Sequence, residues 1–186
     1  MKHFFFILFL FFASRGVFAN SNEAVAYNDK IITEQNKISE TLLTFSGNPN
    51  EFSLSNITTQ VEKSLDVLKG MKAFDGNKDF LISAKALFKF YKNISENEYK
   101  KILYFLENKR NYPQEELDKK VDELTKSIAQ SEGSLDASFQ YNQRKFAEKY
   151  GFALRKNSMA EKFTIGVVHC SFFYLITYSF LCFLKN

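Results

Sequence analysis

The chain has 186 residues, of which 45% are hydrophobic, and a formal net charge of +4. This length is sufficient for one domain with its own hydrophobic core. Residues 20–157 carry 21 of the 25 basic and 20 of the 21 acidic residues, so the central part of the chain is close to neutral. Because nucleic-acid-binding domains usually carry a basic patch or stripe, we expect no nucleic-acid partner.

The residue types that most often perform catalysis lie only near the ends of the chain. Both histidines (His3 and His169) and both cysteines (Cys170 and Cys182) fall outside residues 20–157. The central part therefore lacks the commonest general base and the commonest soft-metal ligands. It also contains no glycine-rich phosphate loop and no nucleophile-elbow motif. We expect no enzymatic activity, no cofactor and no bound metal, since an enzyme here would need a site of Asp, Glu and Tyr alone.

Residues 1–19 have the features of a secretory signal peptide. Lys2 makes the start basic, residues 4–12 are an unbroken apolar run, and residues 17–19 (Val-Phe-Ala) suit a signal peptidase. The apolar run is too short to span a bilayer. We expect an exported protein whose mature chain starts near Asn20, and an uncleaved membrane anchor is the alternative.

Four segments of the central part have the spacing of amphipathic helices. Their apolar residues recur at intervals of three and four, which places them on one face of a helix. The predicted helices span residues 22–45, 53–72, 79–110 and 114–150. We expect Ser53 or Ser55 to cap the second helix and Gly151 to end the fourth. Because the connections are short, the segments predict an all-α, antiparallel up-down-up-down four-helix bundle over residues 20–155.

In two of these helices the apolar stripe, the line of apolar residues along one face, is irregular. In the third helix, Glu98 occupies a position of the stripe at which an apolar residue is expected. In the fourth helix, steps of four and three lead through Ser138 and Asn142, while Phe139 and Phe146 lie one residue beside that line. The apolar face of the fourth helix is therefore predicted to broaden or rotate in its second half.

Polar residues on the stripes are the candidates for a ligand site. Asn28 and Gln35 lie on the stripe of the first helix and Asn142 on that of the last, and antiparallel packing would bring them to one end of the bundle. They predict either a hydrogen-bonded layer that fixes the register or a small polar pocket. With Tyr91 and Glu98 they make up the candidate ligand-binding residues. A bound molecule would lie among the rings of Tyr27, Tyr91, Tyr99 and Phe146.

Three other patterns favour ordinary structural roles. Asp75, Asn77 and Asp79 begin like a calcium loop, but the pattern fails afterwards and predicts a turn instead. Glu98 lacks the Glu-x-x-His partners of a di-iron site and is expected to pair with Lys101 or with a lysine of a neighbouring helix. The row formed by Lys85, Lys89 and Lys92 predicts a solvated helix face, with an anionic-surface patch as the alternative.

The C-terminal segment is apolar enough to contact a membrane. Residues 156–162 are a predicted linker, and residues 163–184 contain no charged residue and are long enough to cross a bilayer. Several polar residues make the segment a poor span, and the basic residues before it would lie outside, against the positive-inside tendency. We expect membrane association through this tail, and burial on a partner or an atypical extension of the chain are the alternatives.

Several short stretches resemble a family of bacterial surface proteins of unknown function, found in spirochaetes and Bacteroidota. These stretches are Tyr27-Asn28-Asp29, Glu34-Gln35-Asn36-Lys37, Phe74-Asp75-Gly76, Leu87-Phe88-Lys89-Phe90-Tyr91-Lys92, Asn97-Glu98-Tyr99 and Phe146-Ala147-Glu148-Lys149-Tyr150-Gly151-Phe152. The resemblance implies an exported helical protein, often attached to the surface. It implies no activity and no functional residues, and the tail from Ser158 onward departs from the family's pattern.

These observations predict an exported four-helix bundle with a structural or interaction role in the periplasm or at the cell surface. An envelope protein is the expected partner, and the C-terminal tail would hold the chain on the membrane. The alternative is a carrier that binds a small ligand in the core of the bundle.

Overall fold

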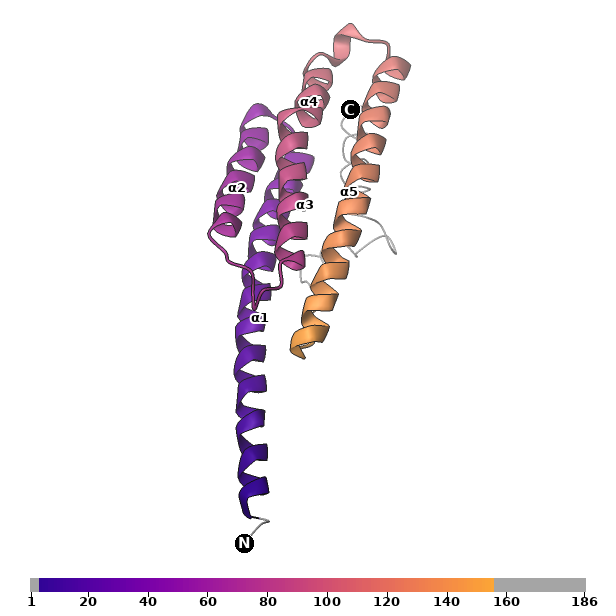
Figure 1. The fold of residues 1–186 in the computed structure, drawn as a ribbon. Coiled ribbons are helices and arrows are strands. Elements are labelled where there is room, and N and C mark those ends of the chain that lie inside the picture. The colour runs from indigo at the N-terminus through magenta and orange to yellow at the C-terminus, as the bar shows by residue number, and fades with distance from the viewer. Residues whose placement is uncertain (1–3, 156–186) are drawn as a thin grey trace.

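All regular structure in the described part of the chain is helical (Figure 1). The protein is represented by a computed structural model that describes residues 4–155, with side chains from residue 20 onward. The elements are α1 (Phe4–Gly47), α2 (Glu51–Lys69), α3 (Asp79–Glu96), α4 (Glu98–Glu107), the 3-10 turn η1 (Lys109–Asn111) and α5 (Gln114–Tyr150). The prediction of an all-α fold is confirmed. The side chains of the expected signal peptide, and the whole of the predicted linker (156–162) and apolar tail (163–184), lie outside the described residues.

The helices form a bundle of four rods, with α3 and α4 together making the third rod (Figure 1). α1 packs on α2, α2 on α3, α3 on α5, and α5 returns to α1. Consecutive rods run in opposite directions, so the stretch of α1 around Tyr27 meets the end of α5, where the rings of Tyr27 and Phe146 are 5.5 Å apart. The core between the rods is built from aliphatic and aromatic side chains, and its largest fully buried members include Phe45, Phe88 and Phe139.

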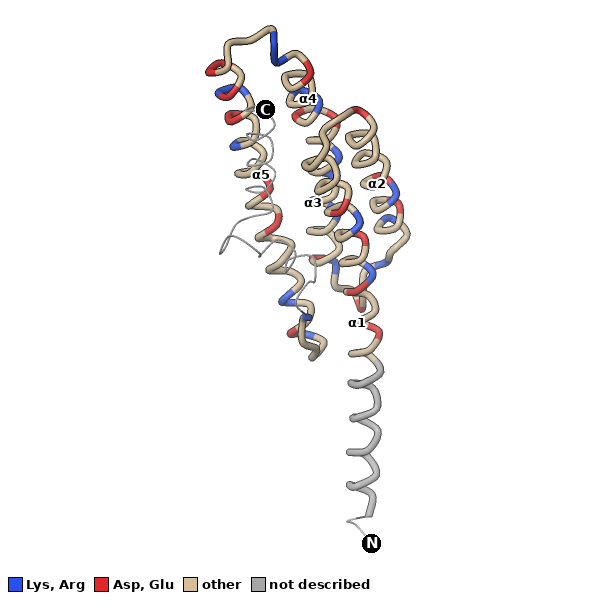
Figure 2. Tube along the Cα trace, turned by 180° about the vertical axis from the view of Figure 1, so that it is seen from behind, with Lys and Arg blue, Asp and Glu red and all other residues tan. Residues whose placement is uncertain are grey.

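No helix among the described residues is both long enough and apolar enough to cross a bilayer. Basic and acidic residues are interspersed along the helices from residue 20 onward (Figure 2).

A capping box starts α2 two residues earlier than predicted. The side chain of Asn50 accepts a hydrogen bond from the Ser53 N–H at 2.9 Å, and the Ser53 hydroxyl accepts one from the Asn50 N–H at 3.1 Å. Asn50 is therefore the cap, and the prediction of Ser53 or Ser55 is wrong. The sequence contained the signal, since Asn is a good N-cap and the two side chains satisfy two otherwise free N–H groups at the start of the helix.

The third rod is broken at Asn97, which explains why Glu98 interrupts the apolar stripe. The backbone of Asn97 leaves the helical region (φ −123°, ψ −77°), and its side-chain amide donates to the Asn93 carbonyl at 2.8 Å. The break changes the phase of the helix by about one residue, so Tyr99 faces the core in the place expected for residue 98. The predicted single helix over residues 79–110 is thus two helices and a 3-10 turn.

The buried face of α5 departs from the predicted stripe after Ile128. The buried positions continue through Glu132, Phe139 and Phe146, while Ser138 is exposed and Asn142 is half-buried. The physical reason is that two large rings contribute far more to burial than small polar side chains do, and they determine how the helix rotates.

Three residues in the left-handed region close the end of the bundle near Tyr27. Asp75 and Gly76 have φ values of 47° and 73° and form a tight turn between α2 and α3. Gly151 (φ 69°) ends α5, with the Phe152 N–H donating to the Ala147 carbonyl at 3.1 Å. The positive φ favours glycine there, and the prediction of Gly151 as the end of the last helix is confirmed.

Candidate functional site

A polar groove lies between α1 and the second half of α5. It encloses about 620 Å³, and most of its lining side chains are amides or carry a charge. The polar residues that line it are Asn28, Asp29, Thr33, Gln35, Asn36, Asp136, Gln140, Gln143, Arg144 and Arg155. Phe139 and Ile32 contribute apolar surface. Side chains that donate and accept hydrogen bonds, with a few apolar atoms beside them, can bind a polar molecule.

A hydrogen bond between two amides crosses the inner part of this groove. Gln143 on α5 donates from Nε2 to the Oδ1 of Asn28 on α1 at 2.9 Å. Asn28 is 6% exposed and donates in turn to Asp29 Oδ1 at 3.1 Å. A layer of polar side chains between the first and last helices was predicted, and Asn28 and Gln35 both line the groove. Asn142 does not line it, because the rotation of α5 brings Gln143 into its place.

The groove contains groups of both charges. Asp136 accepts a hydrogen bond from Gln140 at 2.6 Å, and burial raises the pKa of its carboxyl. Arg144, two turns further along α5, is exposed at the surface of the groove. A ligand in this groove would therefore meet a partly buried hydrogen-bond acceptor and an exposed guanidinium, the side chain best suited to carboxylates.

The identity of the facing residues explains why the groove lies between α1 and α5. At this level the facing positions hold Asn28, Asp136 and Gln143 in place of large apolar residues. Because polar side chains gain little from close burial, the two helices stay far enough apart to leave a groove.

A buried carboxylate forms the second feature of chemical interest. Glu132 on α5 is 3% exposed, and its Oε1 accepts a hydrogen bond from the Tyr91 hydroxyl on α3 at 2.8 Å. Burial raises the pKa of Glu132 to about 7, although the hydrogen bond from Tyr91 opposes the shift. Tyr91 was among the predicted ligand-binding residues, whereas Glu132, which lies between Ile128 and Phe139 on the buried face, was not predicted.

Three buried oxygen atoms near the junction of α3 and α4 lack a hydrogen-bond partner among the described residues. They are Glu132 Oε2, the Tyr99 hydroxyl and Glu98 Oε2. Tyr99 packs its ring on Phe45, with the centroids 5.2 Å apart, and the negative charge of Glu132 adds to the effect of burial in raising the pKa of its hydroxyl. Within the described part of the chain Glu98 forms no ion pair with Lys101 or with a lysine of a neighbouring helix, so the predicted pairing is wrong.

The four rings proposed to surround a ligand do not come together. Tyr27 and Phe146 pack at the end of the bundle beside Phe74. Tyr91 and Tyr99 lie near Glu132. Glu132 precedes Phe146 by fourteen residues, which is about 21 Å along a helix. Within the described residues, no group of three or more His, Cys, Asp and Glu side chains is placed to hold a metal ion.

The chain matches no protein-family model, no curated protein and no solved structure. The resemblance to a bacterial surface-protein family remains a prediction.

Proposed function

We propose that this protein is an exported interaction module of the bacterial envelope, which binds a partner protein through the groove between α1 and α5. The observation that carries this proposal is the groove itself, where amide and charged side chains line about 620 Å³ of space. The lack of His and Cys in residues 20–157 favours binding over catalysis.

The chemistry of the groove suits a segment of polypeptide. Asn and Gln side chains each offer a donor and an acceptor, as a peptide group does. Gln35 forms no hydrogen bond with another described side chain, so its amide is available to a partner. Arg144 would bind a carboxylate of the segment, and Phe139 would contact one of its apolar side chains.

An experiment on the size of the native complex tests this interaction. Arg144→Glu reverses a charge in the groove, and Arg110→Glu reverses the charge of an exposed arginine outside it. The proposal predicts that the wild type and Arg110→Glu migrate in a complex larger than the monomer after gentle extraction of the envelope, while Arg144→Glu migrates as a smaller species. Identical migration of all three forms, whatever their size, would contradict it.

Export and membrane attachment are separate parts of the proposal. The proposed signal peptide ends at residue 19, and the proposed membrane contact lies in residues 163–184. The intact mass of the protein from membrane and soluble fractions distinguishes the possibilities. We expect a species that starts near Asn20, retains the tail and occurs only in the membrane fraction. A soluble species that ends soon after Leu154 would contradict attachment through the tail.

The carrier hypothesis gains no support from the described core. Its four rings lie at two separate levels of the bundle, and the groove between α1 and α5 opens on the surface instead.

A further inference from the structure

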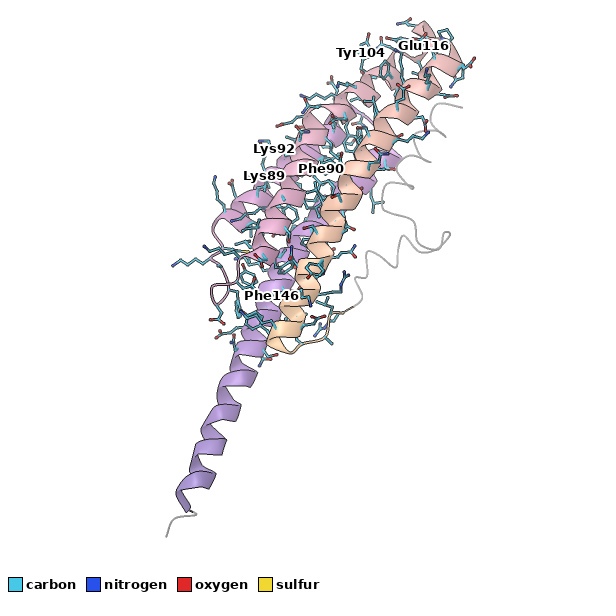
Figure 3. The ribbon with its side chains drawn as sticks, turned by 45° about the vertical axis from the view of Figure 1, so that its right-hand side comes forward. Lys89, Phe90, Lys92, Tyr104, Glu116 and Phe146 are labelled. Carbon is cyan, nitrogen blue, oxygen red and sulfur yellow. The ribbon has the colours of Figure 1, made fainter. Side chains whose placement is uncertain are left out.

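A second groove lies between α2 and α3, at a seam of the bundle that involves neither α1 nor α5. It encloses about 460 Å³ and is lined by Glu62, Leu65, Asp66, Lys69, Lys85, Lys89 and Lys92. The three lysines of α3 follow the i, i+4, i+7 spacing of one helix face. Lys89 and Lys92 project from the side of α3 that points away from α5 (Figure 3).

The acidic residues of this groove are already neutralised within the chain. Lys92 Nζ lies 2.7 Å from Glu62 Oε1 across the seam, and Lys69 Nζ lies 3.5 Å from Asp66 Oδ1 on α2. Lys85 and Lys89 form no ion pair with any described residue. The groove therefore has two uncompensated positive charges, and an anionic partner would complement them.

An exposed apolar side chain continues the same face of α3. Ile82 is 58% exposed and precedes Lys85 by three residues and Lys89 by seven, so the three side chains share one face. Leu65 on α2 provides apolar surface inside the groove. The surface thus combines an apolar contact at one end with positive charge along about 10 Å of helix from Lys85 to Lys92.

We propose that the groove between α2 and α3 docks an acidic amphipathic helix of a partner protein. The carboxylates of that helix would contact Lys85 and Lys89, and its apolar side chains would contact Ile82 and Leu65. Helices that bind in grooves place their own contacts at i, i+3, i+4 and i+7, so we expect the carboxylates of the partner helix to recur at that spacing. Together with the α1–α5 groove, this second surface would let one molecule connect two partners.

A peptide of defined composition tests the proposal. The probe is a fluorescein-labelled peptide of about 15 residues, long enough to form a helix, with Glu on one face and Leu on the other. A scrambled peptide of the same composition is its control. Binding to the full-length chain in non-ionic detergent is measured by fluorescence anisotropy at low and at physiological salt. We expect Lys85→Glu/Lys89→Glu to weaken binding of the amphipathic peptide by at least about tenfold.

Matched variants make the result specific. Lys101→Glu/Lys119→Glu changes the net charge equally at exposed lysines of α4 and α5, and we expect it to alter the affinity by less than about twofold. Lys89→Glu alone repeats the test at an exposed position if the double variant melts at a lower temperature. Equal binding of the scrambled peptide, or equal weakening by both double variants, would overturn the proposal. So would binding to phosphatidylglycerol vesicles through Lys85 and Lys89 without binding to the peptide.

Discussion

At the scale of single residues, Glu132 is the side chain whose environment is most unusual. A carboxyl group that is buried among hydrophobic residues favours its neutral form, because burial removes the water that stabilises the charge. Around it, Tyr91 of α3 donates a hydrogen bond, Tyr99 of α4 lies nearby, and Asp136 on α5 adds a negative charge that raises its pKa further. The protonation of this group is therefore linked to the stability of the fold.

The pKa of Glu132 predicts how stability changes with pH. The folded protein holds this pKa at about 7, above the ordinary value of 4.5, so it binds the proton more tightly than the unfolded chain does. The contribution of Glu132 is fully present below pH 4.5 and is lost as the pH rises to about 7, where the difference reaches about 3 kcal/mol. Urea unfolding between pH 4.5 and 8 should show this loss in the wild type and should not show it in Glu132→Gln.

Glu115→Gln is the matched control for this measurement, because Glu115 is an exposed carboxylate on the same helix. It should follow the wild-type profile. If the wild type and Glu132→Gln had parallel profiles across this pH range, the charge of Glu132 would have no connection with the stability of the fold.

The two tyrosines near Glu132 should respond differently to loss of their hydroxyl groups. Tyr91→Phe leaves Glu132 Oε1 without its donor in the core, which costs about 1–3 kcal/mol of unfolding free energy. Tyr99→Phe removes a buried hydroxyl that has no partner among the described residues, so it should change stability by less than about 0.5 kcal/mol or increase it. Denaturant titrations of both variants at pH 6 compare them directly. Equal destabilisation by the two substitutions would show that the hydrogen bond of Tyr91 stabilises the protein no more than the unpaired hydroxyl of Tyr99 does.

At the scale of helices, the start of α2 depends on a short polar motif. Asn50→Ala removes one half of the capping box and should destabilise the protein by about 1 kcal/mol. Ser55→Ala alters an exposed serine of the same helix and should have almost no effect. Thermal unfolding of the two variants measures the difference. A similar melting temperature for both would mean that packing alone fixes the start of α2.

Hydrophobic spacing predicted where helices exist better than it predicted which face is buried. The core positions of the first helix were found at Ile31, Ile38 and Leu42, but Glu34 occupies the buried place expected for Gln35. Glu34 is stabilised there by Ser64 of α2, whose hydroxyl donates to it at 2.9 Å, and by Lys37 at 2.6 Å. A partner on another helix cannot be read from local spacing, which is why this carboxylate and Glu132 were both missed.

The same limit applies to the candidate site. Asn28 and Gln35 were found because polar residues on an apolar stripe stand out in the sequence, and both line the α1–α5 groove. Gln143 was missed because the phase of a helix of 37 residues is decided by its large rings, Phe139 and Phe146, and not by the small residues between them. The interruption of the apolar stripe at Glu98 was the only periodic sign of the helix break at Asn97, and the hydrogen bonds that make the break are local and cannot be read from spacing.

At the scale of the whole molecule, a side-chain hydrogen bond crosses each of the four seams of the bundle. These bonds join Ser64 to Glu34 (2.9 Å), Thr58 to Ser95 (3.1 Å), Tyr91 to Glu132 (2.8 Å) and Gln143 to Asn28 (2.9 Å). Sliding any helix by one residue would leave buried polar groups without partners. Such contacts fix the register of neighbouring helices more than they increase stability, and they hold the two grooves in a defined shape.

Site-specific crosslinking in the native cell shows whether the groove between α1 and α5 binds a partner protein. A photoreactive amino acid replaces Gln35 inside the groove or Lys101 on the exposed face of α4. We expect a discrete adduct, larger than the protein itself, from position 35 and not from position 101, and Arg144→Glu should abolish it. No adduct from position 35, or the same adducts from both positions, would mean that the groove does not bind a partner protein.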